Sequence, residues 1–140
     1  MKQPVLVEDR GLAIPALKGF PGVYVRYAEE TIGAEGIIAL MADKTDKRMS
    51  FIATTTYIDA KGNAKQFHNS DNFNVEIAKN ISPVDNGFYK TKLSRIFFIK
   101  EYNKTASELS AEEFKDFNQR LVLNGGSLGN FARWFAGLEE

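Results

Sequence analysis

Several stretches before residue 100 have patterns of apolar and polar residues that predict β-strands. Residues 5–7 form a short apolar run, typical of a buried strand, which the acidic pair Glu8-Asp9 is expected to end. Residues 49–58 are rich in β-branched and aromatic side chains, and a glycine-containing turn joins them to residues 64–68 as a predicted hairpin. Two further segments also predict strands: residues 73–77 and 95–99.

Helical periodicity appears in three other places. Apolar residues at three- and four-residue spacing predict a helix over residues 32–41. Ser110 and Glu113 have the spacing of a capping box, which predicts a second helix that begins there and continues to about residue 123. After a glycine pair, a last helix is predicted over residues 127–138, and its aromatic stripe favours packing against the core over a binding role.

Composition narrows the classes of function. A chain of 140 residues is expected to form one domain, residues 1–140. Its 18 basic and 18 acidic residues cancel, so no global field would attract nucleic acid or an anionic membrane. It has no cysteine, which excludes disulfides and thiolate chemistry, and no apolar run long enough to span a membrane. The first residues are too short for a signal peptide, so we expect a cytoplasmic protein.

The adjacent carboxylates Glu8 and Asp9 are the first candidates for chemistry. Two carboxylates at the end of a strand are suited to hold Mg²⁺ together with its waters and substrate phosphates. The alternative is a solvated loop in which one of them caps the next element. His68, the only histidine, is best interpreted as an exposed or hydrogen-bonded residue at a strand end, because a lone histidine does not make a zinc site.

The run Glu8-Asp9-x-Gly11-Leu12, followed by Ala16-Leu17-x-Gly19-x-Pro21-Gly22-Val23-Tyr24, resembles the inosine triphosphate pyrophosphatase family. The similarity continues at Arg26, at residues 31–33 and 35–36 and at Leu40, and it returns at residues 104–109 and 112–113. The resemblance implies an α/β fold, with a mixed sheet and helices on both faces, and hydrolysis of a non-standard purine nucleoside triphosphate such as ITP or XTP to the monophosphate and pyrophosphate. It also implies Mg²⁺ as cofactor, a nucleotide or other small phosphorylated ligand, and a homodimer.

The resemblance also implies roles for single residues. Asp9 takes the place of the catalytic acid and of a metal ligand, and Glu8 that of a second residue associated with the metal. Arg26 stands at a basic phosphate contact. Asn118, Gln119 and Arg120 stand at the family's Ser-His-Arg motif, which contacts the nucleotide. For both arginines the alternative is an ordinary surface ion pair.

Several positions depart from the family pattern. Arg10 replaces a Ser or Thr after the acidic pair, and is a cation available to bind a phosphorylated ligand. Residues 92–95 stand where the family has the residues that bind the base of the nucleotide. The resemblance starts at the Glu-Asp strand, so we expect a fold that lacks the family's first strand and its Ser/Thr-x-Asn-x-x-Lys phosphate loop. Three alternatives therefore stay open: a non-catalytic descendant that binds nucleotide or protein, a half-enzyme completed by another chain, and a fragment of a longer product.

Overall fold

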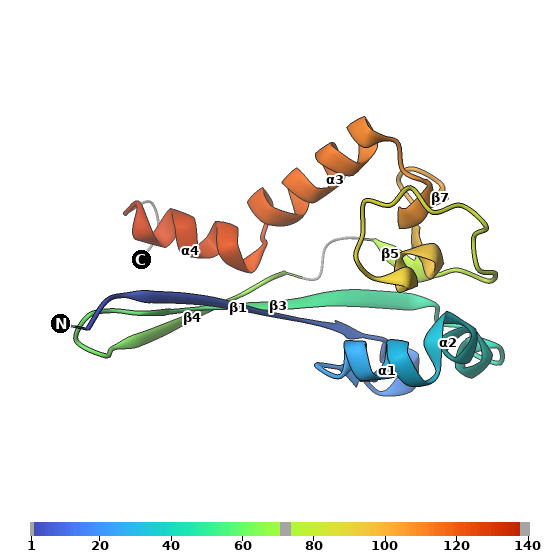
Figure 1. Ribbon diagram of the computed structural model, residues 1–140, viewed down its shortest axis with the longest axis horizontal. Coiled ribbons are helices and arrows are strands. Elements are labelled where there is room, and N and C mark those ends of the chain that lie inside the picture. The colour runs from blue at the N-terminus through green and yellow to red at the C-terminus, as the bar shows by residue number, and fades with distance from the viewer. Residues whose placement is uncertain (1, 71–73, 138–140) are drawn as a thin grey trace.

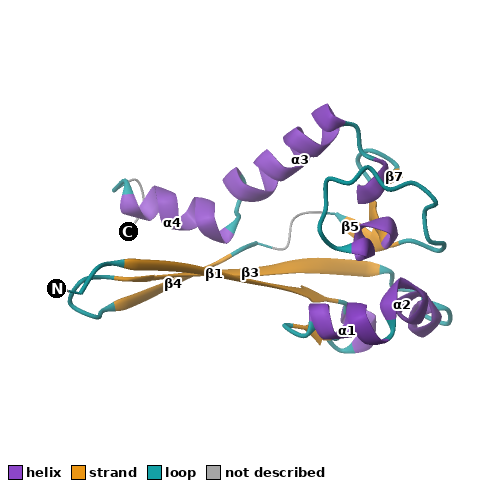
Figure 2. Cartoon of the chain, in the orientation of Figure 1, coloured by secondary structure: helices purple, strands orange, loops and turns teal. Residues whose placement is uncertain are grey.

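The computed structural model describes residues 2–70 and 74–137, which form a sheet with helices on both of its faces (Figures 1 and 2). Within these residues the sheet has seven strands in the order β2-β1-β3-β5-β6-β7, and β4 pairs with β3. The strands are β1 Val5–Ala13, β2 Pro21–Gly22, β3 Arg48–Ile58, β4 Ala64–His68, β5 Val75–Ile77, β6 Phe97–Ile99 and β7 Lys104–Thr105. The helices are α1 Val25–Thr31, α2 Gly33–Met41, α3 Ala111–Leu123 and α4 Ser127–Phe135, with 3₁₀ turns η1 Pro15–Leu17, η2 Lys92–Ile96 and η3 Ala106–Glu108.

The predicted α/β fold with helices on both faces is confirmed. The sheet was expected to mix parallel and antiparallel strands, yet every pairing among the described strands is antiparallel. Parallel neighbours need a long crossover connection, whereas the predicted hairpin joins β3 to β4 through a tight turn. In that turn the Asp59 carboxylate accepts hydrogen bonds from the backbone N–H groups of Lys61 and Asn63.

Strand β1 differs from the prediction in length and in exposure. It does not end at the acidic pair, because its pairing with β3 runs unbroken from Val5–Ile58 to Ala13–Ser50. On its other side, among the strands that the structure describes, β1 pairs only with β2, near its end. The predicted buried run is therefore exposed: Val5, Leu6 and Val7 keep 47, 46 and 53% of their accessible surface. The acidic pair lies inside an exposed edge strand and not in a loop.

Helices α1 and α2 cover one face of the sheet and α3 and α4 the other (Figure 1). The single helix predicted over residues 32–41 is α2, and a separate helix, α1, precedes it, divided from it at Gly33, whose φ is +64°. No helix in residues 2–70 and 74–137 has the length and apolar character that crossing a bilayer requires. The main core gathers buried side chains from both layers, among them Leu12, Ile37, Met41, Leu93, Ile96 and Phe117.

The strand predicted over residues 95–99 is only partly correct. Residues up to Ile96 form the 3₁₀ turn η2, and β6 begins at Phe97. The turn is fixed by a local cap, since the Thr91 hydroxyl accepts a hydrogen bond from the backbone N–H of Leu93. A distant residue also contributes, because the Glu29 carboxylate of α1 accepts hydrogen bonds from the Thr91 hydroxyl and the Lys92 backbone. The strand predicted over 73–77 is β5; Phe73 lies outside the described residues.

The last helix, α4, ends at Phe135; Leu138, at the end of the predicted range, lies outside the described residues. Its aromatic residues were expected to pack in the core. They instead pack on the β3–β4 hairpin, where Phe131 and Trp134 contact the rings of Tyr57 and Phe67. The helix therefore holds the hairpin to the rest of the fold.

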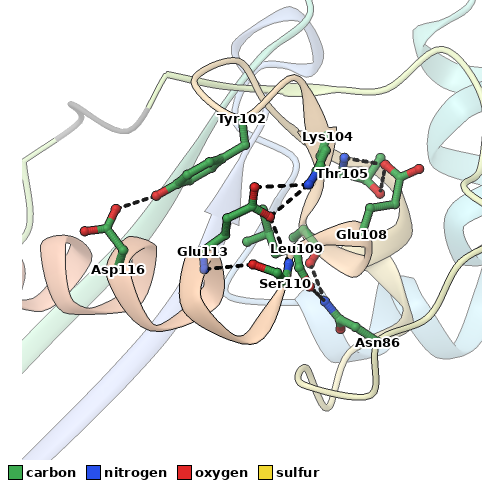
Figure 3. Close-up of polar contacts among 10 residues, drawn as sticks. Asn86, Tyr102, Lys104, Thr105, Glu108, Leu109, Ser110, Glu113 and Asp116 are labelled. Carbon is green, nitrogen blue, oxygen red and sulfur yellow. Dashed lines mark hydrogen bonds and ion pairs between the residues drawn. The ribbon is translucent and has the colours of Figure 1, made fainter.

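The capping box predicted for α3 is confirmed. The Ser110 hydroxyl accepts a hydrogen bond from the backbone N–H of Glu113, and the Glu113 carboxylate accepts one from the backbone N–H of Ser110 (Figure 3). Glu113 also pairs with Lys104 at 3.0 Å. A second box closes η3, where the Glu108 carboxylate accepts hydrogen bonds from the Thr105 backbone and hydroxyl at 2.7 and 2.8 Å.

The η3 box makes the stability of the fold depend on pH. The Thr105 backbone N–H holds the pKa of Glu108 below its ordinary value of 4.5. A lowered folded-state pKa means that Glu108 stabilises the fold above pH 4.5 and that this contribution is lost as the pH falls through the lowered pKa. We expect Glu108→Gln to reduce stability at pH 7, with the deficit shrinking toward pH 3. Urea unfolding across this range tests it, and Glu112→Gln, on the exposed face of α3, should show a much smaller deficit; equal deficits would contradict it.

Candidate functional site

A cavity of about 200 Å³ lies between the sheet and the layer formed by α3 and α4. Strands β1 and β3 line one side, and α3 with the first residues of α4 lines the other. Most of its wall is apolar and includes Phe51, Phe117 and Leu121. Its polar lining consists of Glu8, Arg10, Asn69, Tyr89, Asn118 and Ser127. Three predicted site residues, Glu8, Arg10 and Asn118, are therefore brought to one cavity.

Glu8 is held from two sides in this cavity. Arg10 donates hydrogen bonds from Nε and Nη2 to Glu8 Oε2 at 3.1 and 2.9 Å. The Ser127 hydroxyl lies 3.4 Å from Glu8 Oε1 and itself accepts a 2.9 Å hydrogen bond from the Thr55 hydroxyl. Thr55 and Ser127 are both buried, and they join β3 to the first turn of α4 beneath the carboxylate. The charge of Glu8 is thus balanced by Arg10, and its orientation is fixed by two hydroxyls.

Asp9 points to the other face of the sheet. Successive side chains of a strand alternate between faces, so Asp9 cannot share the face of Glu8 and Arg10. Asp9 lies opposite Thr54 in the pairing of β1 with β3, and Thr54 lies opposite His68 in the pairing of β3 with β4. The His68 Nδ1 atom lies 3.0 Å from the Thr54 hydroxyl, as expected of a hydrogen-bonded residue at a strand end. The continuation of β1 through the acidic pair therefore separates the two carboxylates.

This arrangement tests the predicted magnesium site. With Glu8 and Asp9 on opposite faces, the two carboxylates do not converge on one ion. In the part of the chain that the structure describes, no three His, Asp or Glu side chains are grouped closely enough to hold a metal. A single carboxylate can take part in binding Mg²⁺ if substrate phosphates and water supply most of the ligands. Mg²⁺ usually keeps several ligands of this kind.

The two predicted arginines form ion pairs away from the cavity. Arg26, on α1, is exposed and pairs with Glu30 one turn later at 2.9 Å. Arg120, on α3, donates to Glu101 at 2.7 Å and pairs with Asp116 at 3.0 Å. Both arginines therefore form surface ion pairs, which is the alternative to a contact with the nucleotide. Gln119 is exposed on α3 and does not line the cavity.

Tyr102 completes the cluster around Arg120. Its hydroxyl donates to the Asp116 carboxylate (Figure 3) and accepts a 2.7 Å hydrogen bond from Arg120 Nη2. The hydrogen bond to Glu101 raises the pKa of Arg120 above its ordinary value, so this side chain stays a cation. A phosphate that binds Arg120 would have to displace Glu101 or Asp116.

Three polar residues of the cavity lining were missed by sequence reasoning: Asn69, Tyr89 and Ser127. Tyr89 lies in the connection between β5 and η2, residues 78–91, which contains no helix or strand (Figure 2). Ser127 is the first residue of α4, where the sequence predicts the start of a helix and no role in a site. No local pattern marks them, because the cavity is assembled from segments that are distant in sequence.

The close contact of α4 with the end of α3 shapes one wall of the cavity. A Cβ atom on Gly129 would lie 2.1 Å from the Val122 carbonyl oxygen. We expect Gly129→Ala to displace α4 and to lower the free energy of unfolding by about 1–3 kcal/mol, the usual cost of overpacking. Urea unfolding measures the loss. Ala132→Ser, which adds one atom at an exposed position of the same helix, should lose much less, and an equal loss would show that the contact is not limiting.

Comparisons with known proteins agree with this fold. The Ham1 family matches residues 1–122. Two relatives named dITP/XTP pyrophosphatase are 34% identical (Methanopyrus kandleri) and 35% identical (Pyrococcus horikoshii), covering 95 and 94% of this chain. The chain spans 65% of the length of each. The Ham1 protein of Staphylococcus aureus superposes with a TM-score of 0.76 at 23% identity, covering 99% of this chain and 70% of that one.

Proposed function

The chain belongs to the Ham1 family, and from this membership we propose that it hydrolyses non-standard purine nucleoside triphosphates such as dITP and XTP to the monophosphate and pyrophosphate. The observation that carries the proposal is the match of dITP/XTP pyrophosphatases to 94–95% of the chain. The family model covers residues 1–122, which include the acidic pair and most of the residues around the cavity. The chain spans 65% of the length of those relatives, so the activity named for the whole proteins is a proposal for this chain.

The proposed roles come from the family resemblance, and the positions of the side chains set what each residue would have to do. Asp9 orients or deprotonates the attacking water, since its carboxylate lies on an exposed strand and accepts only the Arg10 backbone N–H among its described neighbours. Arg10 follows Asp9 in the strand but lies on the opposite face, so it would reach a phosphate beside Asp9 only by turning from Glu8 around the exposed edge of β1. Mg²⁺, bound mainly to the substrate phosphates, would offset their charge. Arg26 and Arg120 would contact the nucleotide only after releasing the carboxylates with which they are paired.

A second candidate function is nucleotide binding without turnover. The observation that favours it is the pairing of the cations: Arg10, Arg26 and Arg120 each bind a carboxylate of the protein itself. A third arrangement, in which another chain completes the site, is favoured by the outer edge of β1, which among the described strands pairs only near residues 12 and 13. We therefore include a homodimer in the proposal, and a cytoplasmic location, where nucleoside triphosphates are available.

Release of pyrophosphate tests the proposed function. Purified protein is incubated with ITP, XTP and dITP, and with ATP and GTP as ordinary triphosphates, in the presence of Mg²⁺ and again after chelation with EDTA. We expect pyrophosphate from the first three and much less from ATP and GTP. Binding of IMP with no turnover of any triphosphate would support the second candidate. Turnover equal for all five nucleotides would contradict the proposed substrate class.

A further inference from the structure

A second cavity, of about 720 Å³, opens beside the C-terminal end of α2. We call it the α2 groove; its wall comes from α2, β5, β6 and the residues just after β5, at the end of the molecule where α2 and β5 lie (Figure 1). It shares no lining residue with the cavity that contains Glu8, so the two are separate sites. Its volume lies in the roughly 300–1,000 Å³ range of small-molecule sites.

One part of the α2 groove is apolar. Ile38 and Met41 come from α2, Ile77 from β5 and Phe98 from β6. Met41 and Ile77 are buried members of the main core, and Ile38 packs against that core. This wall is therefore part of the packed fold, and it favours a ligand with an apolar body.

Two lysines stand together at the end of α2, where they line the groove. The Lys47 ammonium donates a hydrogen bond to the Met41 carbonyl and forms no salt bridge with a carboxylate in the described residues, which leaves it two N–H donors. Lys44 pairs with Asp43 at 3.1 Å, yet 80% of the Asp43 side chain is exposed. Lys44, and more weakly Lys47, hold the pKa of the Asp43 carboxyl below its usual range. Both ammonium groups therefore act on one place, where the anion of a ligand can replace Asp43.

A third lysine, Lys79, extends the positive charge along the groove. It is exposed, two residues after β5, and takes part in no ion pair with the residues that the structure describes. Glu76 also lines the groove, but its carboxylate is bound to Lys100, which does not. The groove therefore carries a net positive charge beside an apolar wall, although the charges of the whole chain cancel.

We propose that the α2 groove binds a small molecule that carries a phosphate monoester on an apolar ring or chain. The phosphate contacts the three lysines, and the apolar body lies on the wall formed by α2, β5 and β6. Lysine is a common phosphate ligand, and a dianion interacts more strongly with several cations than a carboxylate does. The inference does not rest on the proposed function, because neither residue of the acidic pair lines the groove.

Calorimetric titration with α-naphthyl phosphate tests the proposal, with inorganic phosphate, naphthol and naphthoate as comparisons. We expect one molecule of naphthyl phosphate to bind per chain, about tenfold or more tightly than inorganic phosphate or naphthol, since only this probe offers both the dianion and the ring. Naphthoate should bind more weakly than naphthyl phosphate. Equal affinity for naphthol would overturn the role of the lysines, and equal affinity for naphthoate would overturn the phosphate class.

Three variants at exposed positions locate the site. Lys79→Gln should weaken the binding of naphthyl phosphate by about two- to fivefold, the range of one exposed ion pair. Asp43→Asn should strengthen it, because this change frees Lys44 and Lys47. Lys61→Gln, a matched change in the β3–β4 turn outside the groove, should leave the affinity unchanged.

The pattern across the variants decides the assignment. An equal loss in Lys79→Gln and Lys61→Gln would mean a general attraction of anions and would overturn it, as would an unchanged affinity in Lys79→Gln. Weaker binding in Asp43→Asn would also overturn it. Because all three positions are exposed, each variant should unfold at the urea midpoint of the wild type, so a change in affinity is not a change in folding.

Discussion

Replacing Asp9 with asparagine is expected to reduce pyrophosphate release by about a hundredfold or more, the scale of a lost general base. Asparagine keeps the shape of the side chain and can still accept the hydrogen bond from the Arg10 backbone, so the strand should persist. The measurement is kcat/KM for ITP with Mg²⁺. Asp43→Asn, a matched change at an exposed carboxylate paired with Lys44, should leave the rate unchanged.

The two faces of β1 make a second comparison informative. Glu8 lies in the cavity and Asp9 on the opposite face, so their substitutions probe two separate environments. If Asp9 performs the chemistry, Glu8→Gln should chiefly raise KM, because it frees Arg10 and alters the cavity. Loss of turnover in Glu8→Gln with full activity in Asp9→Asn would instead assign the catalytic role to the cavity face.

Elements fixed by local chemistry were predictable from the sequence. The β3–β4 hairpin follows from β-branched strands around an Asp-containing turn, and the start of α3 follows from the Ser110–Glu113 spacing. The length and exposure of β1 were not predictable, since they depend on pairing with a strand some forty residues later. The turn η2 was missed for a similar reason, because Glu29 reaches it from α1.

The sequence predicted several residues of the candidate site but not how their side chains are arranged. A strand that ends at the acidic pair would let both carboxylates turn toward one ion, and a strand that continues sends them to opposite faces. Resemblance pointed to Asn118, yet its neighbour Tyr89 lies in an irregular connection without a sequence signal. The hydroxyl pair behind Glu8 joins residues 72 positions apart, a separation at which no periodic pattern carries information.

Leu93→Ala is expected to lower the free energy of unfolding by about 2–5 kcal/mol, the range for a buried leucine whose loss leaves a cavity. Leu93 has 0% of its surface exposed and belongs to the main core, together with Ile96 of the same turn. Domains of this size are stable by about 5–15 kcal/mol, so this one change removes a large share. Urea unfolding gives the loss as a lower midpoint with an unchanged slope.

Leu123→Ala is the matched control, because it deletes the same atoms from a leucine that is 54% exposed at the end of α3. Its expected cost is within about 0.5 kcal/mol, as for most surface substitutions. Equal losses in the two variants would mean that η2 does not pack into the core as described. Because Leu93 does not line the cavity, Leu93→Ala should keep the proposed preference for ITP over ATP at temperatures where it remains folded. A core defect would then change how long the protein stays folded and leave its choice of base intact.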